Sequence, residues 1–217
     1  MDSTWNYPIQ NKKIDSIISV YKPKMEALMM ERVAITKEEF RSSRPQSLLS
    51  NFAADAILSY SKEISQADFA LTNFGGLRAT MPKGDVRRYD IYSIFPFENN
   101  LVIIGLRGED VLDLFKLFAE QRVEAISGNV SLRISKGVLK DAKIGGREID
   151  PNKIYYVATI DFLLTGGDNL SMLKRAVSTK ETGILLRDVI FSVIKRQMSE
   201  VGELRSNIDN RLIIENN

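Results

Sequence analysis

The sequence of 217 residues contains no cysteine and no histidine. Without histidine, the chain cannot form a Ser-His-Asp triad, a Cys-His pair or an imidazole-rich zinc site. The chemistry that remains uses carboxylate, Lys, Arg, Tyr, Ser or Thr side chains, a carboxylate-only Mg or Ca site, or binding without catalysis. The missing cysteines suit an oxidising periplasm as well as a reducing cytoplasm, so they do not decide the compartment.

An excess of one charge and long hydrophobic runs are also missing. Lys and Arg number 30 against 28 Asp and Glu, a net charge of +2, which gives no reason to expect a nucleic-acid partner. No apolar run approaches the length of about 18 residues that spans a bilayer, so we expect no transmembrane segment. The first ten residues lack the charged and apolar regions of a signal peptide, which leaves a cytoplasmic chain or a chain whose leader has been removed.

Hydrophobic periodicity and turn residues predict helices and strands in alternation. We expect helices over residues 15–30, 47–62, 108–121 and 184–198, a short helical piece over 90–95, and strands over 33–36, 69–72, 101–106, 130–134, 138–144, 154–160 and 211–214. Pro23 should bend or split the first helix near Lys22, because proline removes an internal hydrogen bond. Interleaved helices and strands with a strand-rich middle favour an α+β fold, a mixed β-sheet layered with helices, over a doubly wound fold.

A glycine turn with polar neighbours follows the predicted strand 69–72. It holds an amide, two glycines and a guanidinium, namely Asn73, Gly75, Gly76 and Arg78. Glycines let backbone N–H groups approach a ligand, and the Arg fork suits phosphate or carboxylate oxygens. The alternative is an ordinary hairpin turn with a solvated arginine.

A second glycine turn follows the predicted strand 154–160. Phe162 precedes Gly166 and Gly167, and Asp168 comes directly after them. An aspartate in such a turn can accept two hydrogen bonds from a vicinal diol, as acidic residues do with ribose. The alternative is an Asx turn in which the carboxylate caps its own backbone.

Two further groups could join a site formed by these turns. Phe95 and Phe97 flank Pro96, and we expect one ring in the core while the other could stack on a flat base. Arg41 and Arg44, in the polar loop before the second helix, could add positive charge. The alternatives are a core position for both rings and solvated arginines.

Taken together, in this order and spacing, these segments resemble the C-terminal, substrate-binding domain of the bacterial and animal 5′-nucleotidase family, which also includes UDP-sugar hydrolases and 2′,3′-cyclic phosphodiesterases. Residues 50–56 resemble the family's GNLxxDA helix, 73–78 its NxGGIR turn, 96–97 its PF pair and 162–168 its FxxxGGD segment. We accordingly divide the chain into an N-terminal helical extension, residues 1–36, packed on one domain of this type, residues 37–217.

The resemblance implies a role for each matching residue. Phe97 and Phe162 would sandwich the base of a nucleoside or nucleoside 5′-phosphate. Asn73 would face the base, and Asp168 would hold the ribose hydroxyls. Arg78 would face the ribose-phosphate end of the ligand.

The match is less complete at three positions. A further family arginine precedes the GNLxxDA helix, where Arg44 is the nearer match and Arg41 stays open. The family's PFGN has Glu98 in place of its glycine here, and its GGDG with a following aromatic ends in Asn169 and Leu170. The first change could alter base preference or leave the Glu98 side chain pointing to solvent, and the second could weaken an apolar contact.

The family's catalytic half is a separate N-terminal metallophosphatase domain with two divalent metals held by Asp, Asn and several His residues. A chain without histidine cannot build that centre, so the resemblance implies no catalytic residue, no metal ligand and no cofactor in this chain. We therefore expect the binding half of a 5′-nucleotidase, a hydrolase of nucleotide catabolism, with the two metals supplied by a metallophosphatase domain or chain. The alternatives are a stand-alone nucleoside- or nucleotide-binding module without catalysis, and one domain cut from a longer chain. The resemblance also favours a periplasmic or cell-surface location after leader removal, with the cytoplasm as the alternative.

Overall fold

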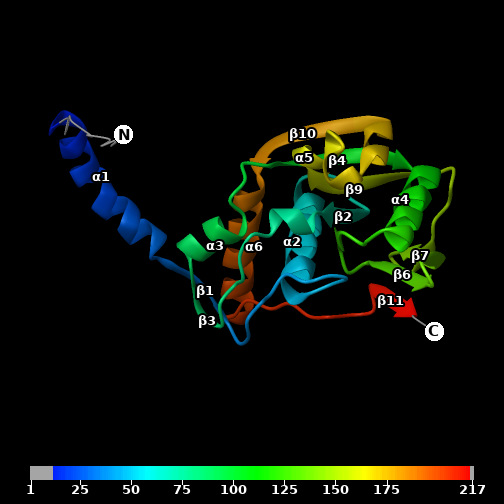
Figure 1. Cartoon of the computed structure of the whole chain (residues 1–217), viewed down its shortest axis with the longest axis horizontal. Helices are drawn as coiled ribbons and strands as arrows, with labels where there is room; N and C mark the ends of the chain where they lie inside the picture. The colour runs from blue at the N-terminus through cyan, green and yellow to red at the C-terminus, as the bar shows by residue number, and fades with distance from the viewer. Residues whose placement is uncertain (1–11, 216–217) are drawn as a thin grey trace, which may run out of the picture.

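A five-stranded mixed sheet lies at the centre of the fold (Figure 1). The computed structural model describes residues 12–215. In chain order the elements are α1 (Lys12–Met29), β1 (Arg32–Thr36), α2 (Leu48–Ile64), β2 (Phe69–Thr72), the 3-10 turn η1 (Phe74–Gly76), β3 (Gly84–Arg87), α3 (Arg88–Ile94), β4 (Asn100–Arg107), α4 (Gly108–Glu120), β5 (Ala125–Ile126), β6 (Val130–Ser135), β7 (Val138–Ile144), β8 (Arg147–Glu148), β9 (Ile154–Ile160), α5 (Asp161–Leu164), η2 (Gly167–Asn169), η3 (Ser171–Arg175), β10 (Ser178–Leu185), α6 (Leu186–Val201) and β11 (Leu212–Glu215). The predicted α+β fold with a mixed sheet is confirmed.

The central sheet has the strand order β10-β4-β9-β2-β5. β2 runs parallel to β9, whereas the other neighbouring strands are antiparallel. Residues 101–106 of β4 are all buried, as expected for a strand covered on both faces of its sheet. The parallel pair places the carboxyl ends of β2 and β9 at one edge of the sheet, which is also where β4 begins.

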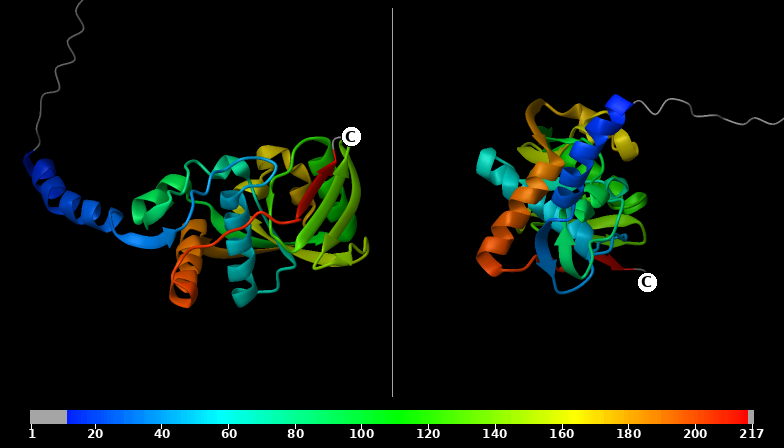
Figure 2. Two further views of the ribbon diagram at one scale, coloured as in Figure 1. Left: turned by 90° about the horizontal axis from the view of Figure 1, so that it is seen from below. Right: turned by 90° about the vertical axis from the view of Figure 1, so that its left-hand side faces the viewer.

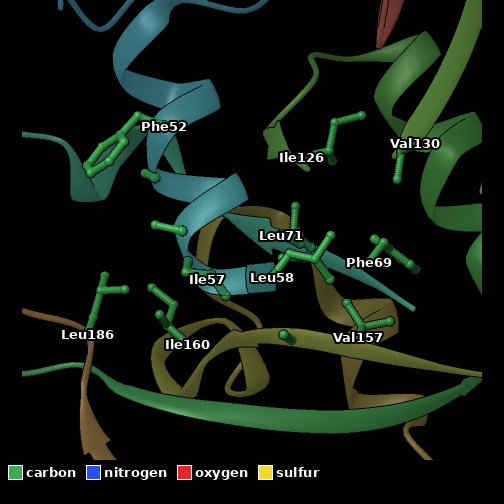
Figure 3. Packing of buried hydrophobic residues seen from close by; sticks show 14 of the residues in the cluster. Phe52, Ile57, Leu58, Phe69, Leu71, Ile126, Val130, Val157, Ile160 and Leu186 are labelled. Carbon is green, nitrogen blue, oxygen red and sulfur yellow. The ribbon is translucent and has the colours of Figure 1, made fainter. Parts of the chain in front are cut away.

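Helix α2 packs on β2, β9 and β5 and lies beside α6, and it carries much of the core (Figure 3). Phe52, Ile57 and Leu58 on α2 are buried, and each such side chain contributes roughly 1.5–3 kcal/mol when removed from water. The helix begins where Ser47 and Ser50 exchange hydrogen bonds, with the Ser50 N–H donating to Ser47 Oγ at 3.2 Å and the Ser47 N–H to Ser50 Oγ at 2.9 Å. This capping box satisfies amides that a helix start leaves unpaired.

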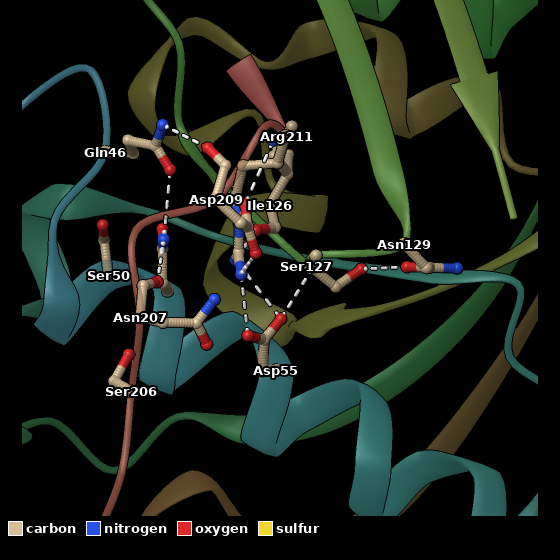
Figure 4. Close-up of polar contacts among 12 residues, drawn as sticks. Gln46, Ser50, Asp55, Ile126, Ser127, Asn129, Ser206, Asn207, Asp209 and Arg211 are labelled. Carbon is tan, nitrogen blue, oxygen red and sulfur yellow. Dashed lines mark hydrogen bonds and ion pairs between the residues drawn. The ribbon is translucent and has the colours of Figure 1, made fainter. Parts of the chain in front are cut away.

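A buried arginine ties the C-terminal segment to α2 and β5 (Figure 4). Arg211 precedes β11, which adds in parallel to β6 in the sheet β11-β6-β7-β8. Its guanidinium donates to Asp55 at 2.8 Å, to Asp209 at 2.7 Å and to the Ile126 carbonyl at 2.8 Å. Burial disfavours the charged form of Arg211, but its bonds to the two aspartates outweigh burial and raise its pKa above the usual value.

Helix α1 projects away from the rest of the chain (Figures 1 and 2). Side chains 18–28 are exposed. Helix α1 runs through Pro23 as one helix, so of the bend or split predicted near Lys22 the split does not occur. β1 pairs with β3, and the domain division at residue 36 stays a prediction. None of the helices within residues 12–215 is both long and apolar enough to cross a membrane.

Four strands of the structure carry no clear sequence signal. β3, β5 and β8 have four, two and two residues, too few for a period-2 pattern. β10 is an edge strand with mostly exposed, polar residues, so its pairing with β4 leaves no hydrophobic alternation. The last helix therefore starts at Leu186, two residues later than predicted, and residues 184–185 belong to β10.

Candidate ligand-binding site

The candidate site lies where β2 and β9 end and β4 begins. Phe69 of β2 is opposite Val157 of β9 in parallel register, so the segments that follow these strands leave the sheet at the same edge. Leu101 of β4 pairs with Ile160 at the end of β9, which brings the residues before β4 to that edge as well. The two glycine turns and the PF pair, far apart in the sequence, are therefore neighbours.

The segment after β2 forms the 3-10 turn η1, with Asn73 as its N-cap residue, rather than a hairpin turn. The Gly76 N–H donates to the Asn73 carbonyl at 3.3 Å. The Asn73 side chain lies against both glycines. A β-carbon on Gly76 would approach Asn73 Oδ1 to 2.8 Å, and one on Gly75 would approach Nδ2 to 3.3 Å. The turn is thus shaped around this amide.

The segment after β9 forms the short helix α5 and then the turn η2. Gly166, Asp168 and Asn169 have φ angles of 88°, 52° and 64°, and Asp and Asn tolerate this left-handed region better than other non-glycine residues. A β-carbon on Gly167 would lie 2.4 Å from the Phe162 ring. With the ring in this position only glycine fits beside it, so the second turn packs closely against an aromatic side chain.

A hydrogen bond from Asn73 Nδ2 to Asp168 Oδ2 joins the two turns. Asn73 is 4% exposed, and its Oδ1 has no hydrogen-bond partner within residues 12–215. A carboxylate oxygen can accept more than one hydrogen bond. Asp168 is only half-buried, so it can bind Asn73 and still accept from a ligand.

The two turns and the PF pair enclose a cavity of about 270 Å³. Its lining residues are Asn73, Gly75, Gly76, Arg78, Phe97, Asn99, Phe162 and Asp168. Phe97 is 48% exposed and Phe162 is 45% exposed, and no aromatic ring in the described part of the chain stacks on either. Accessible ring faces next to a carboxylate and an amide can hold a flat heterocycle that carries hydroxyl groups.

Arg78 is an exposed residue of the cavity lining. Among residues 12–215 the one hydrogen bond of its side chain, from Nη1 to the Gly75 carbonyl, measures 3.5 Å, which is at the limit for such a bond. The guanidinium therefore has donors available for an anionic group of a ligand.

A second arginine holds the segment that carries Phe97. Arg187, in the first turn of α6, donates from Nη1 to the carbonyls of Phe95 at 3.0 Å and Phe97 at 3.3 Å. Its guanidinium also lies 4.7 Å from the centre of the Tyr92 ring. Phe95 is buried in the core, so the two rings around Pro96 have the different surroundings expected from the sequence.

The two loop arginines do not line this cavity. Arg44 donates to the Val123 carbonyl at 2.8 Å and to Glu124 Oε1 at 2.7 Å. Arg41 is exposed and pairs with Glu39. The implied role of Arg44 in contacting the ligand stays a prediction.

Three residues around the site were not singled out from the sequence. Asn99 lines the cavity, and its place in the PFGN-like segment was a usable signal. Arg187 donates to two backbone carbonyls that lie 92 and 90 positions away in the sequence. Glu124 accepts from a backbone N–H that lies 50 positions away. No local sequence pattern reports contacts at that separation.

Comparison with known proteins decides the family. Residues 27–175 match the family model described as 5′-nucleotidase, C-terminal domain. The chain belongs to this family. The resemblance found in its motifs is thereby confirmed.

Curated relatives of this 5′-nucleotidase C-terminal domain include two much longer proteins. UshA of Escherichia coli (strain K12) is 27% identical over 192 residues, which cover 86% of this chain and 35% of UshA. The trifunctional nucleotide phosphoesterase protein YfkN of Bacillus subtilis (strain 168) is 25% identical over 213 residues, covering 89% of this chain and 14% of YfkN. The chain thus spans about a third or less of the length of these relatives.

Solved structures share the fold. A 5′-nucleotidase precursor from Thermus thermophilus matches with a TM-score of 0.80 at 22% identity, covering 97% of this chain and 44% of that one. The NAD nucleotidase of Haemophilus influenzae matches with a TM-score of 0.73 at 17% identity, covering 95% and 42%. At these identities the likeness concerns the architecture of the domain.

The two divalent metals that the resemblance implies for the catalytic half need several ligands close together. Within residues 12–215, no group of three or more Asp or Glu side chains is close enough to hold a metal ion, and the sequence has no His or Cys. These residues do not fit a dimetal centre, so we assign no metal-dependent step to them.

Proposed function

We propose that this domain is the nucleoside- or nucleotide-binding half of a 5′-nucleotidase. The observation that carries the proposal is the cavity at the shared edge of β2, β9 and β4. It combines two accessible aromatic rings, a carboxylate and a guanidinium within about 270 Å³, which is close to the lower end of the usual size for small-molecule sites.

Each part of a nucleotide would meet a group of matching chemistry. The base would lie between Phe97 and Phe162, where stacking contributes about 1–3 kcal/mol per base. Asp168 would accept hydrogen bonds from the ribose hydroxyls while it still binds the Asn73 amide. Arg78 would pair with the 5′-phosphate at the open side of the cavity.

Hydrolysis of the phosphomonoester would be supplied by a metallophosphatase domain or chain with its two divalent metals. The greater length of the curated relatives supports this division of labour. The binding half would hold the nucleoside and present the 5′-phosphate to that second domain. Periplasmic or cell-surface location stays a prediction from the resemblance.

Calorimetric titration with adenosine, AMP and ribose 5-phosphate tests the binding role. We expect saturable binding of the first two ligands and at least tenfold weaker binding of ribose 5-phosphate, because the rings recognise the base. Absence of adenosine and AMP binding, or equal affinity for ribose 5-phosphate, would contradict the proposal.

A second experiment separates a split enzyme from a stand-alone binding module. The chain is mixed with metallophosphatases from the same source, and phosphate release from AMP is measured with each protein alone and with the mixture. Release that requires both proteins supports the binding half of an enzyme. Nucleoside binding without release in any mixture would favour the stand-alone module.

A further inference from the structure

A buried carboxylate lies directly behind the first turn of the site. Glu124 precedes β5, which pairs antiparallel with β2, and it is 2% exposed. Its Oε2 accepts the Phe74 N–H at 2.8 Å, and its Oε1 accepts from Arg44 Nη2 at 2.7 Å. Glu124 therefore contacts the backbone next to Asn73 without lining the cavity.

The Phe74 N–H needs this acceptor because it is the first amide of the 3-10 turn. Later amides of the turn bond within it, Gly76 N–H to the Asn73 carbonyl and Leu77 N–H to the Phe74 carbonyl at 3.1 Å. The first amide of such a turn has no partner inside it. Phe74 is buried, so without Glu124 this donor would be left unpaired away from water.

The Glu124 carboxylate in turn needs a cation, because a buried charge is stable only when it is paired. Arg44 supplies the charge and is held on two further sides. Its Nη1 donates to the Val123 carbonyl at 2.8 Å, and its guanidinium lies 4.4 Å from the centre of the Phe74 ring. Arg44 thus contacts both the segment before β5 and the Phe74 side chain of the turn.

The position of Asn73 depends on what holds its neighbours. Its Oδ1 is buried without a partner in the described part of the chain, so this conformation carries an energetic cost. Because Oδ1 makes no hydrogen bond there, the amide is held by its Nδ2 and by the residues beside it in the chain. Glu124 fixes the next residue, Phe74, by its backbone, and Asp168 fixes the Asn73 side chain.

We propose that Glu124 and Arg44 are positioning residues that hold the turn 73–78 in its binding conformation. The inference rests on the proposed function, since it concerns how the nucleoside site is built. It assigns Glu124 a role that the sequence did not suggest. It also gives Arg44 a role behind the cavity in place of a direct contact with the ligand.

Three variants test the pair: Glu124→Gln, Arg44→Met and the double variant that combines them. In Glu124→Gln the Arg44 guanidinium loses the carboxylate that it pairs with. In Arg44→Met the buried Glu124 carboxylate loses its cation. In the double variant, the amide side chain introduced by Glu124→Gln still offers a carbonyl oxygen to the Phe74 N–H, and no buried charge remains. Dissociation constants for adenosine and AMP are measured by calorimetry for each.

We expect each single variant to raise both dissociation constants by the same factor, about tenfold, as for one buried polar group left unpaired. The double variant should return both to within about threefold of the parent. A loss for AMP alone that the double variant does not restore would overturn the proposal and assign Arg44 to the phosphate. Unchanged affinity in both single variants would also overturn it.

The matched control is Asp110→Asn. Asp110 is a buried carboxylate paired with Arg175 at 3.1 Å, and it follows the far end of β4, at the opposite edge of the sheet. This variant should lower thermal stability and leave both dissociation constants unchanged. Equal losses of affinity in Asp110→Asn and Glu124→Gln would mean that Glu124 acts only through overall stability.

Hydrogen exchange of the Phe74 amide gives a readout that needs no ligand. We expect slow exchange in the parent and in the double variant, and at least tenfold faster exchange in Glu124→Ala, which has no acceptor. If the parent binds no nucleoside, the proposed function fails, and this exchange still decides whether Glu124 holds the turn. Equal exchange in the parent and Glu124→Ala would overturn the positioning role.

Discussion

Replacing either cavity phenylalanine by alanine should weaken binding of nucleosides by an amount that follows from ring exposure. Phe97 and Phe162 are 48% and 45% exposed, and a phenylalanine offers on the order of 200 Å² of surface. Each ring therefore has about 90 Å² left to bury, which at about 25 cal/mol per Å² gives about 2.3 kcal/mol. If a base covers the whole of this area, Kd rises about 40-fold on substitution, and if it covers half, about sevenfold.

Calorimetric titration of Phe97→Ala and Phe162→Ala with adenosine and AMP checks this range. Tyr89→Ala is the matched control, because Tyr89 is 59% exposed on α3 and does not line the cavity. We expect the control to bind like the parent, and ribose 5-phosphate to bind the Phe variants as it binds the parent. A loss of ribose 5-phosphate binding as large as the loss of adenosine binding would refute stacking as the cause.

Three further substitutions separate the other roles. Asp168→Asn should lower the affinity for adenosine about tenfold, as for a lost charged hydrogen bond. Calorimetry should show a nearly unchanged affinity for 2′,3′-dideoxyadenosine, and equal losses for both ligands would refute the diol contact. Arg78→Ala should lower the affinity for AMP more than the affinity for adenosine. An equal loss for both ligands would mean that Arg78 only shapes the turn. Burial raises the pKa of Asp209, but the bonds and charge of Arg211 outweigh it and hold that pKa below the usual value. Asp209→Asn should therefore lower the free energy of unfolding by about 1–2 kcal/mol at pH 7. The difference should fade as the pH falls below about 4, where the Asp209 carboxylate is protonated first in the unfolded chain and, at lower pH, in the folded chain as well. Urea unfolding at pH 7 and pH 3 would show a constant difference if this reasoning is wrong.

The sequence predicted the elements whose residues carry their own signal. The buried run 101–106 and the apolar face of α4 require no tertiary information, because each stretch must bury its own side chains. The first glycine turn could be predicted for a similar reason, because its signal is local. Gly75 and Gly76 lie against the side chain of Asn73, which is close to them in the sequence. Their ligand roles came from the resemblance and remain predictions.

What the sequence could not supply were contacts between distant segments. The polar edge strand β10 exists only because β4 offers it a partner. Glu124 and Phe74 are 50 positions apart, and the residues next to them in the sequence give no indication of the hydrogen bond between them. Arg44 matched a family position by its distance from α2, yet its guanidinium is bound to Val123 and Glu124.

The parallel pairing of β2 and β9 brings the two glycine turns together in one site. It places Asn73 and Asp168, 95 positions apart, within hydrogen-bonding distance, although each turn is built for its own reason. Asp168 is then shared, because one carboxylate accepts from the Asn73 amide and has lone pairs left for ligand hydroxyls. Under the proposed function, occupancy of the ribose position and the geometry of the first turn would therefore be coupled through Asp168. A ligand that bonds to this carboxylate should also order residues 73–78, even where it does not touch them.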